Sequence, residues 1–268
     1  MHNTKIIAVS GKGGVGKTSV SAAFVRLLID AYPEKRILAI DADPAIGLST
    51  ALGVEVTETL DDIRKSIVTR VENGNPKAAI EMLSEARFRI FDTMVEDQKF
   101  SFLAIGRPEA AGCYCKVNAY LKEVIDLLAQ EYDYVVIDGE AGIEQINRRV
   151  MEKVTHLILI SDASRKGISV IETIKKVSDE LVMYDECGVI INRVTDETLF
   201  ESSGIRERLE ADGLKLLSVI GTDGEQTIND IKGDSVFALD AHAPIMEGAR
   251  QALTGIGLLE GGEKNCVI

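Results

Sequence analysis

Short apolar runs alternate along the chain with longer stretches in which apolar residues recur at helical spacing. Continuous apolar runs of this length indicate strands buried on both faces, and the amphipathic stretches between them indicate the covering helices. The pattern predicts an α/β fold with a mostly parallel sheet of about seven strands and helices on both faces. The expected strands span residues 6–9, 37–40, 102–105, 134–137, 157–160, 189–191 and 216–220.

Residues 57–98 depart from this alternation. They are polar and helix-prone, show no strand signal, and contain the turn sequence Asn73-Gly74-Asn75-Pro76. We expect a helical insertion over the carboxyl ends of the strands, where open α/β sheets bind ligands. With a length of 268 residues, the chain 1–268 is expected to form one large domain.

Acidic residues dominate the charge. The 30 Lys and Arg against 43 Asp and Glu give a net charge of −13, which repels nucleic acid and anionic membranes. No apolar run reaches the roughly 18 residues of a membrane span, and the first strand follows the N-terminal residues without a signal peptide. We expect a cytoplasmic protein that binds neither nucleic acid nor membrane, so a protein partner or a cation is favoured.

A glycine-rich segment follows the first expected strand and precedes a helical stretch over residues 18–30. It reads Gly11-Lys12-Gly13-Gly14-Val15-Gly16-Lys17-Thr18, which is the phosphate-binding loop pattern. Its glycines let successive backbone N–H groups approach phosphate oxygens, and the helix adds its positive end. Lys17 is expected at the β- and γ-phosphates, Thr18 at Mg²⁺ and Ser19 at the α-phosphate. The loop therefore predicts a nucleoside triphosphate site.

Carboxylates end two other expected strands. Asp41 and Asp43 follow the second strand in Asp41-Ala42-Asp43-Pro44, and Asp138 ends the fourth strand ahead of Gly139. We assign all three to the Mg²⁺ site with Thr18, Asp138 acting through water as in Walker B segments. Asp43 is also expected to orient or deprotonate the attacking water. Capped polar turns are the alternative for each carboxylate taken alone.

A dipeptide after the sixth expected strand completes the predicted nucleotide site. Asn192-Arg193 follows residues 189–191, and the Asn192 amide is suited to bind the edge of adenine. A dipeptide is a short signal, and an ordinary turn residue is the alternative.

Three of these segments together resemble the deviant Walker A ATPases. They are Lys12-Gly-Gly-Val-Gly-Lys-Thr18, Asp41-Ala-Asp-Pro44 and Asp138-Gly-Glu-Ala-Gly142. This group includes the septum-positioning and plasmid-partitioning proteins of the MinD/ParA type, the arsenite-pump ATPases and the nitrogenase iron proteins. The resemblance covers most of the chain. It implies an ATPase that works as a homodimer, in which Lys12 reaches the partner's nucleotide and joins Lys17 and Asp43 in catalysis.

Two cysteines lie just beyond the third expected strand, in Cys113-Tyr114-Cys115. Thiols one residue apart can chelate one soft or borderline metal ion, and two such loops meeting about a dimer axis would supply four thiolates. A pair of ordinary buried cysteines is the alternative. The three histidines show no ligand spacing.

The Gly-Cys-Tyr-Cys sequence in this ATPase context looks like the CooC-type accessory ATPases, which assist nickel insertion into carbon monoxide dehydrogenase or acetyl-CoA synthase. The resemblance implies an intersubunit Ni²⁺ or Zn²⁺ site at Cys113 and Cys115, and it does not choose between the two client enzymes. Two alternatives stay open. An iron-protein-like electron donor needs a further cluster cysteine, which residues 139–151 lack, and a MinD/ParA-type spatial organiser uses a basic tail or face, which this acidic chain lacks.

Overall fold

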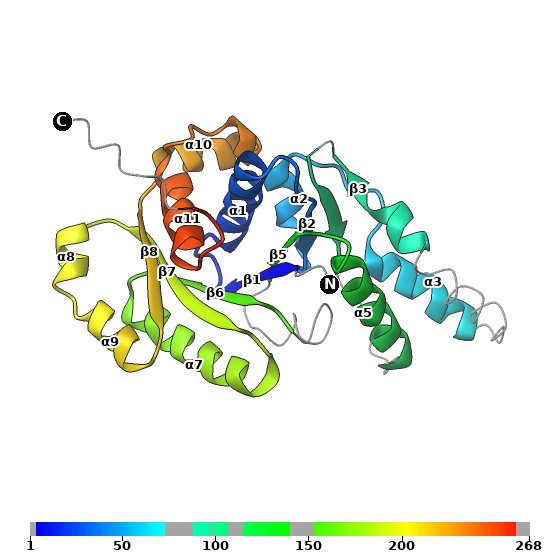
Figure 1. Ribbon diagram of the computed structural model, residues 1–268, viewed down its shortest axis with the longest axis horizontal. Helices are drawn as coiled ribbons and strands as arrows, with labels where there is room; N and C mark the ends of the chain where they lie inside the picture. Colours follow the sequence, from blue (N-terminus) through cyan, green and yellow to red (C-terminus); the bar gives the residue numbers. More distant parts are fainter. Residues whose placement is uncertain (1–3, 73–87, 98, 107–114, 140–152, 261–268) are drawn as a thin grey trace.

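The fold alternates strands and helices along the chain (Figure 1). The computed structural model describes residues 4–72, 88–97, 99–106, 115–139 and 153–260. The strands are β1 (Lys5–Gly11), β2 (Ile37–Asp41), β3 (Val95–Glu96), β4 (Ser101–Ala104), β5 (Tyr134–Asp138), β6 (His156–Ser161), β7 (Glu186–Val194) and β8 (Lys215–Gly221). The helices are α1 (Lys17–Ala31), α2 (Gly47–Leu52), α3 (Leu60–Glu72), α5 (Cys115–Ala129), α7 (Arg165–Leu181), α8 (Glu197–Glu201), α9 (Ile205–Ala211), α10 (Gly224–Lys232) and α11 (Pro244–Gly255).

The strands form one eight-stranded sheet in the order β3-β4-β2-β5-β1-β6-β7-β8. Every neighbouring pair is parallel except β3 with β4. The first strand of the chain lies in the middle, because Ala8 is in register with Ile137 of β5 on one side and Leu157 of β6 on the other. The parallel arrangement brings the carboxyl ends of β1, β2, β5 and β6 to one edge of the sheet.

The predicted α/β class is confirmed, with one correction to the strands. All seven expected runs are strands, but β3 falls inside residues 57–98, where no strand was expected. It has two residues and pairs antiparallel with β4 at the end of the sheet. A strand this short leaves no periodic signal in the sequence, since its pairing depends on the backbone. The described remainder of that region contains α3 and helical residues 88–93.

Helices cover both faces of the sheet. Figure 1 shows α1 and α11 on one side and α5 and α7 on the other. Neighbouring residues of β1 serve opposite cores: Ala8 packs with the α5 and α7 side, whereas Ile7 and Val9 pack with the α1 and α11 side. Burial on both faces explains why the strands read as unbroken apolar runs. None of the helices in the described ranges combines the length and the apolar character needed to cross a membrane.

Candidate nucleotide site

The glycine-rich loop joins β1 to α1 and is pressed against two other strands. Gly11 has φ +144°, and a Cβ there would lie 2.0 Å from the Ile160 carbonyl oxygen of β6. Gly16 has φ +92°, and its Cβ would lie 2.6 Å from Nδ2 of Asn192. Larger residues are excluded at both positions. Gly16 also precedes α1 without a side-chain cap, so the first N–H groups of that helix are free of a capping side chain and suited to phosphate.

Lys17 lies inside this loop. Its side chain is buried, and Nζ donates a hydrogen bond to the carbonyl oxygen of Lys12 at 3.2 Å. The cation therefore sits under the backbone that is suited to surround the phosphates. The contact of Lys17 with the β- and γ-phosphates stays a prediction.

Lys12 has a different environment, at the rim of the loop. Its Nζ lies 2.5 Å from Oδ2 of Asp162, the residue that follows β6. Oδ1 of Asp162 accepts hydrogen bonds from Oγ and the backbone N–H of Ser164. Partial burial acts to raise the pKa of Asp162, but the hydrogen bonds from Lys12 and Ser164 hold it below its ordinary range. In this structure Lys12 is thus engaged within its own chain.

Asp162 was missed by the sequence analysis, although a usable signal existed. Asp162 directly follows the apolar strand β6, which pairs with β1. Asp41 and Asp138 occupy similar places, as the last residues of β2 and β5. The carboxyl ends of neighbouring parallel strands meet at one edge, so the same reasoning applied to residues 157–160 would have found it.

Asp138 ends β5 and faces the start of α1. Oδ2 accepts a hydrogen bond from Thr18 Oγ1 at 2.7 Å, and Oδ1 accepts one from Ser21 Oγ at 3.0 Å. Burial raises the pKa of Asp138 to about 6, although both hydroxyl donors act to lower it. Ser21 is a further residue that the sequence analysis missed.

Asp41 ends β2 and is in register with Asp138. It accepts backbone hydrogen bonds from Leu48 at 2.8 Å and Asp43 at 3.0 Å. Burial, and next the charge of Asp138, raise the pKa of Asp41 to about 7. Two buried carboxylates beside a hydroxyl form a set of hard oxygen donors that fits Mg²⁺, so Thr18, Asp41 and Asp138 would hold it, directly or through water. When bound, the ion neutralises phosphate charge.

Asp43 begins a strained segment beside this donor set. It is half-buried, and its Oδ1 accepts a hydrogen bond from the Ala45 N–H at 2.9 Å. Ile46 has φ +51°, a left-handed conformation that a β-branched residue rarely adopts. A Cβ at the next residue, Gly47, would lie at an ordinary van der Waals distance of 3.5 Å from Cγ2 of Thr18. Gly47 therefore lies next to the end of the phosphate loop.

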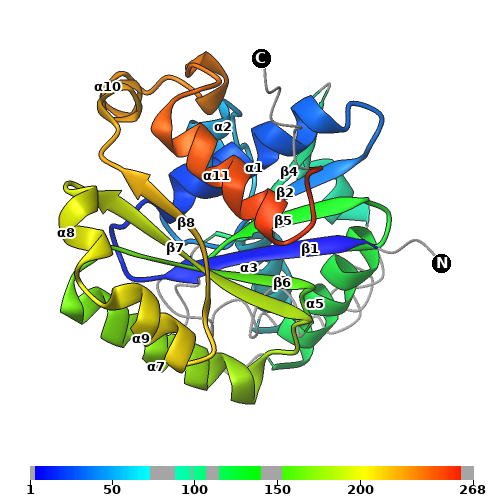
Figure 2. The ribbon, with the colours of Figure 1, turned by 60° about the vertical axis from the view of Figure 1, so that its left-hand side comes forward.

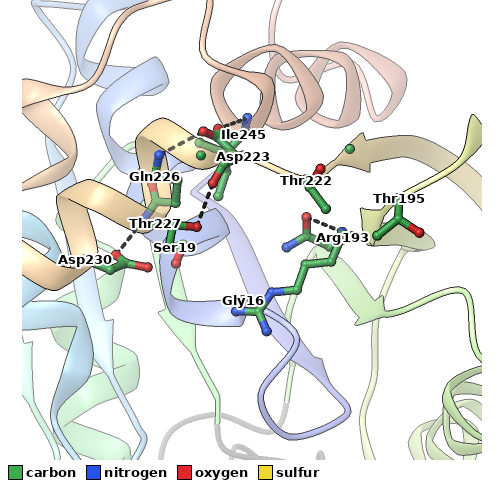
Figure 3. Close-up of a pocket in the computed structure, with 13 residues that line it drawn as sticks. Gly16, Ser19, Arg193, Thr195, Thr222, Asp223, Gln226, Thr227, Asp230 and Ile245 are labelled. Carbon is green, nitrogen blue, oxygen red and sulfur yellow. Dashed lines mark hydrogen bonds between the residues drawn. The ribbon is translucent and has the colours of Figure 1, made fainter.

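A cavity of about 380 Å³ opens beside Gly16 and Ser19 (Figure 3). Asn192 and Arg193 lie at its border, as expected, but both bind the phosphate loop. Nδ2 of Asn192 donates to the Val15 carbonyl at 2.8 Å, and Arg193 donates to the Gly14 carbonyl at 2.7 Å. The contact between Asn192 and adenine stays a prediction.

The far wall of this cavity comes from the end of β8 and from α10, which the sequence analysis did not assign to the site. Asp223 caps α10 through a hydrogen bond from the Gln226 N–H and binds the Ile245 N–H with its other oxygen. The cavity lies next to the start of α1 and has room for the nucleoside part of a nucleotide. The wall residues are Thr195, Gly221, Thr222, Asp223, Gly224, Gln226, Thr227, Asp230 and Ile245.

The predicted thiol site falls largely outside the described residues. Cys113 is not among them, and Cys115 is the first residue of α5, with its side chain likewise not described. Within the described ranges, no three or more His, Cys, Asp or Glu side chains gather in a group able to hold a metal ion. The metal role of Cys113 and Cys115 stays a prediction.

A glycine-rich loop between a central parallel strand and a helix, with an Asp at the end of a neighbouring strand, defines a P-loop nucleotide-binding protein. Residues 6–236 match the model of the CobQ/CobB/MinD/ParA nucleotide binding domain. The chain belongs to this family of ATPases.

Its relatives include both an archaeal protein and a bacterial accessory protein. An ATP-binding protein of Methanocaldococcus jannaschii is 42% identical over 237 residues, which cover 87% of this chain and 91% of that protein. The carbon monoxide dehydrogenase accessory protein CooC of Rhodospirillum rubrum is 27% identical over 226 residues, covering 76% of this chain and 85% of CooC. The fold is similar to the septum site-determining protein MinD of Pyrococcus horikoshii complexed with Mg-ADP, with a TM-score of 0.66, 21% identity, and coverage of 94% of this chain and 96% of that one.

Proposed function

We propose that this protein is an ATP-hydrolysing metallochaperone that closes into a homodimer on ATP and carries Ni²⁺ or Zn²⁺ between Cys113 and Cys115 of two subunits. Its client is carbon monoxide dehydrogenase or acetyl-CoA synthase, into which it assists nickel insertion. The relationship to CooC, at 27% identity, supports this assignment. The metal ion is cargo, whereas Mg²⁺ belongs to the nucleotide site.

The observation that carries the metal part is the sequence Cys113-Tyr114-Cys115, in which two thiols one residue apart are able to bind one soft or borderline metal ion. A thiolate, rather than a thiol, is the form that binds nickel or zinc. Cys113 supplies the second thiolate of each subunit, and a two-fold axis would bring together four.

A short chain of hydrogen bonds supports coupling between the nucleotide and this metal site. The Ile105 N–H donates to the carbonyl oxygen of Asp41 at 2.9 Å, and Asp41 also holds the Leu48 N–H. Ile105 and Gly106 lead directly into the segment that contains Cys113. A change at Asp41 on nucleotide binding or hydrolysis would therefore reach Ile105, which precedes the thiol segment in the sequence, through one hydrogen bond.

The catalytic roles are part of the proposal. Lys17 holds the phosphates, Asp43 orients or deprotonates the attacking water, and Lys12 leaves Asp162 to stabilise charge on the partner's nucleotide. Hydrolysis then relaxes residues 41–49, which changes either the affinity of the dimer for its metal ion or its contact with the client.

Metal stoichiometry tests the proposal. Equilibrium dialysis with Ni²⁺ or Zn²⁺ and a non-hydrolysable ATP analogue is expected to give about one ion per dimer. The double variant Cys113→Ser/Cys115→Ser is expected to lose this binding. The control variant Cys187→Ser, which replaces a cysteine of β7, is expected to keep it. Equal binding by the double variant and the wild type would overturn the metal site.

Three further measurements address the client and the alternatives. Nickel insertion into apo carbon monoxide dehydrogenase and into apo acetyl-CoA synthase, each with ATP, identifies which enzyme the protein serves. Anaerobic purification of a brown protein with bound iron would instead favour the iron-protein-like electron donor. Nucleotide-dependent binding to anionic vesicles or DNA would favour the MinD/ParA-type spatial organiser.

A further inference from the structure

The two edges of the sheet are finished differently. At one edge, the short antiparallel strand β3 lies outside β4. At the other edge, β8 pairs with β7 and has no strand on its outer side within the described ranges. Figure 1 shows β8 as the last strand, seven residues long. An unpaired strand edge presents N–H and C=O groups that can pair with another chain.

The direction of these backbone groups follows from one hydrogen bond. The Thr222 N–H donates to the Val194 carbonyl of β7 at 3.2 Å. Backbone groups of successive strand residues point to alternate sides, so those of Ile220 and Ser218 also face β7. Val219 and Gly221 therefore direct their N–H and C=O groups outward. The register between the two strands shifts twice. Between Ile191 and Val194 the extra residue lies on β7, so the alternation along β8 continues. Between Val189 and Ile190 it lies on β8, which ends the regular stretch on the N-terminal side.

A slot of about 300 Å³ follows this edge. It touches the four consecutive residues 216–219. Ser218 and Val219 are consecutive residues of the regular stretch and point to opposite faces, so a cavity that touches both runs along the edge of the sheet. Figure 2 shows β8 between α11 and the pair α8 and α9. Phe200 and Arg206 line the slot on one side and Gln251 lines it on the other.

The slot combines a polar floor with an acidic rim. Ser218 is only 5% exposed, and its Oγ has no hydrogen-bond partner in the part of the chain that the structure describes. Glu201 is neutralised by Arg206 at 2.9 Å, whereas Glu197 has no ion-pair partner among the described residues. One negative charge is left at the rim, in a chain whose net charge is −13.

We propose that the β8 edge binds an extended segment of a partner protein, which adds to the sheet as a further strand and places a Lys or Arg against Glu197. The outward N–H and C=O groups of Val219 and Gly221 supply the main-chain hydrogen bonds. The slot receives alternate side chains of the segment, and the rim selects a basic one. The slot shares no lining residue with the nucleotide cavity, although Gly221, at the end of the β8 edge, borders that cavity. The proposal does not depend on the metal function.

Peptide selection followed by hydrogen exchange tests the site. A phage-displayed library of random twelve-residue peptides is selected against the full chain, and the enriched peptide is titrated into it. We expect alternating apolar residues and at least one Lys or Arg, and a slowing of amide exchange at Val219 by about tenfold or more at saturation. The same peptide with N-methylated alternate amides is expected to bind at least about tenfold more weakly. Failure to enrich any peptide, or unchanged exchange at Val219, would overturn the proposal.

Matched variants on α8 separate the rim charge from general surface effects. Glu197→Lys is expected to weaken the basic peptide by about fivefold and to favour the same peptide with Glu in place of its basic residue. Leu199→Ser changes an exposed residue of the same helix that does not line the slot, so it is expected to bind like the wild type. Equal affinity of the Glu197→Lys variant for both peptides contradicts the proposal. Edge-to-edge self-association that the peptide dissolves, seen by sedimentation, would assign the surface to a second copy instead.

Discussion

Lysine and aspartate side chains have opposite environments at two places around the phosphate loop. We call these places the loop floor (Lys17, Asp41 and Asp138) and the loop rim (Lys12 and Asp162). At the floor, Lys17 is buried and held by a backbone carbonyl, and burial raises the pKa values of Asp41 and Asp138. At the rim, Lys12 is partly exposed and paired with Asp162, whose pKa is held below its ordinary range. The floor carboxylates therefore have no ion-pair partner among the described residues, whereas at the rim the charges of Lys12 and Asp162 neutralise each other.

This difference separates binding from assembly. Two buried carboxylates at the floor destabilise the folded chain when they are ionised. The binding of Mg²⁺ with its nucleotide therefore stabilises the floor most strongly. At the rim, Lys12 is already paired with Asp162. A second subunit stabilises the rim only if Lys12 leaves Asp162 and binds the phosphates of that subunit's nucleotide. We therefore expect changes at the floor to affect nucleotide binding and stability, and changes at the rim to affect the dimer.

Removal of the floor lysine is expected to have the largest effect. Lys17→Ala should lower ATP affinity by on the order of a hundredfold, because it removes a buried cation directed at the phosphates. Isothermal titration with Mg-ATP measures this. The matched variant Lys12→Ala is expected to retain ATP affinity within about threefold, and an equal loss in both variants would break the distinction between floor and rim.

Removal of the rim lysine is expected to have the second largest effect, which is a weaker ATP-dependent dimer. Lys12→Gln should weaken the dimer formed with a non-hydrolysable ATP analogue by about tenfold or more, since the partner's nucleotide loses a cation. Sedimentation velocity over a range of protein concentrations measures the dimer affinity. A dimer as stable as that of the wild type would show that Lys12 stays with Asp162 throughout.

The floor carboxylates are expected to make the magnesium-free and nucleotide-free protein less stable as the pH rises. Asp41 has a pKa of about 7 in the folded chain against an ordinary value of 3.8, so the folded state binds more protons in this range. The free energy of unfolding should therefore fall by about 2 kcal/mol between about pH 5 and pH 7. Urea unfolding at several pH values measures the slope.

Two isosteric variants sharpen this test. Asp41→Asn is expected to make the pH dependence shallower, because it removes one of the two floor carboxyls with a raised pKa and leaves Asp138. Asp162→Asn is expected to leave it unchanged, because a carboxyl with a lowered pKa is ionised in both states across this range. A profile that Asp41→Asn leaves as steep as before would contradict the assignment to the floor.

The smallest expected effect concerns the competition for Lys12. Asp162→Asn should release Lys12 and strengthen the ATP-dependent dimer by about fivefold, the equivalent of about 1 kcal/mol for a partly exposed ion pair. Glu172→Gln removes a carboxylate of α7 that pairs with Arg208 away from the loop, and it is expected to leave the dimer unchanged. A weaker dimer with Asp162→Asn would mean that Asp162 supports assembly rather than opposing it.

The sequence predicted what depends on local patterns. The seven longer strands were visible because both faces of the sheet are buried, and the loop from Gly11 to Thr18 was visible because close backbone approach requires glycine. Strand β3 was not visible, because two residues show no periodicity. Asp41 and Asp138 were found from their places after or at the ends of apolar strands, and the same signal at Asp162 was overlooked.

What the sequence left out depends on contacts between distant segments. Most of the wall of the nucleoside cavity comes from residues 221–230, with Thr195 and Ile245, and no motif marks these residues. They line the same cavity as Gly16 only because the fold places β8 and α10 near the start of α1. The binding of Asn192 to the Val15 carbonyl likewise follows from the approach of β7 to the loop. The outer edge of β8 follows from the order of the strands in the sheet, because β8 is the last strand in that order and no described strand pairs with its outer side.

Ile46 gives the segment after β2 a preferred direction of change. Holding a β-branched residue at φ +51° costs on the order of 1 kcal/mol or more, and the hydrogen bonds of Leu48 to Asp41 and of Ser49 to the Ile46 carbonyl offset that cost. Loosening of those bonds would release the strain at Ile46, so a change at Asp41 favours movement of this segment. Re-formation of the bonds returns the segment to its place beside Thr18.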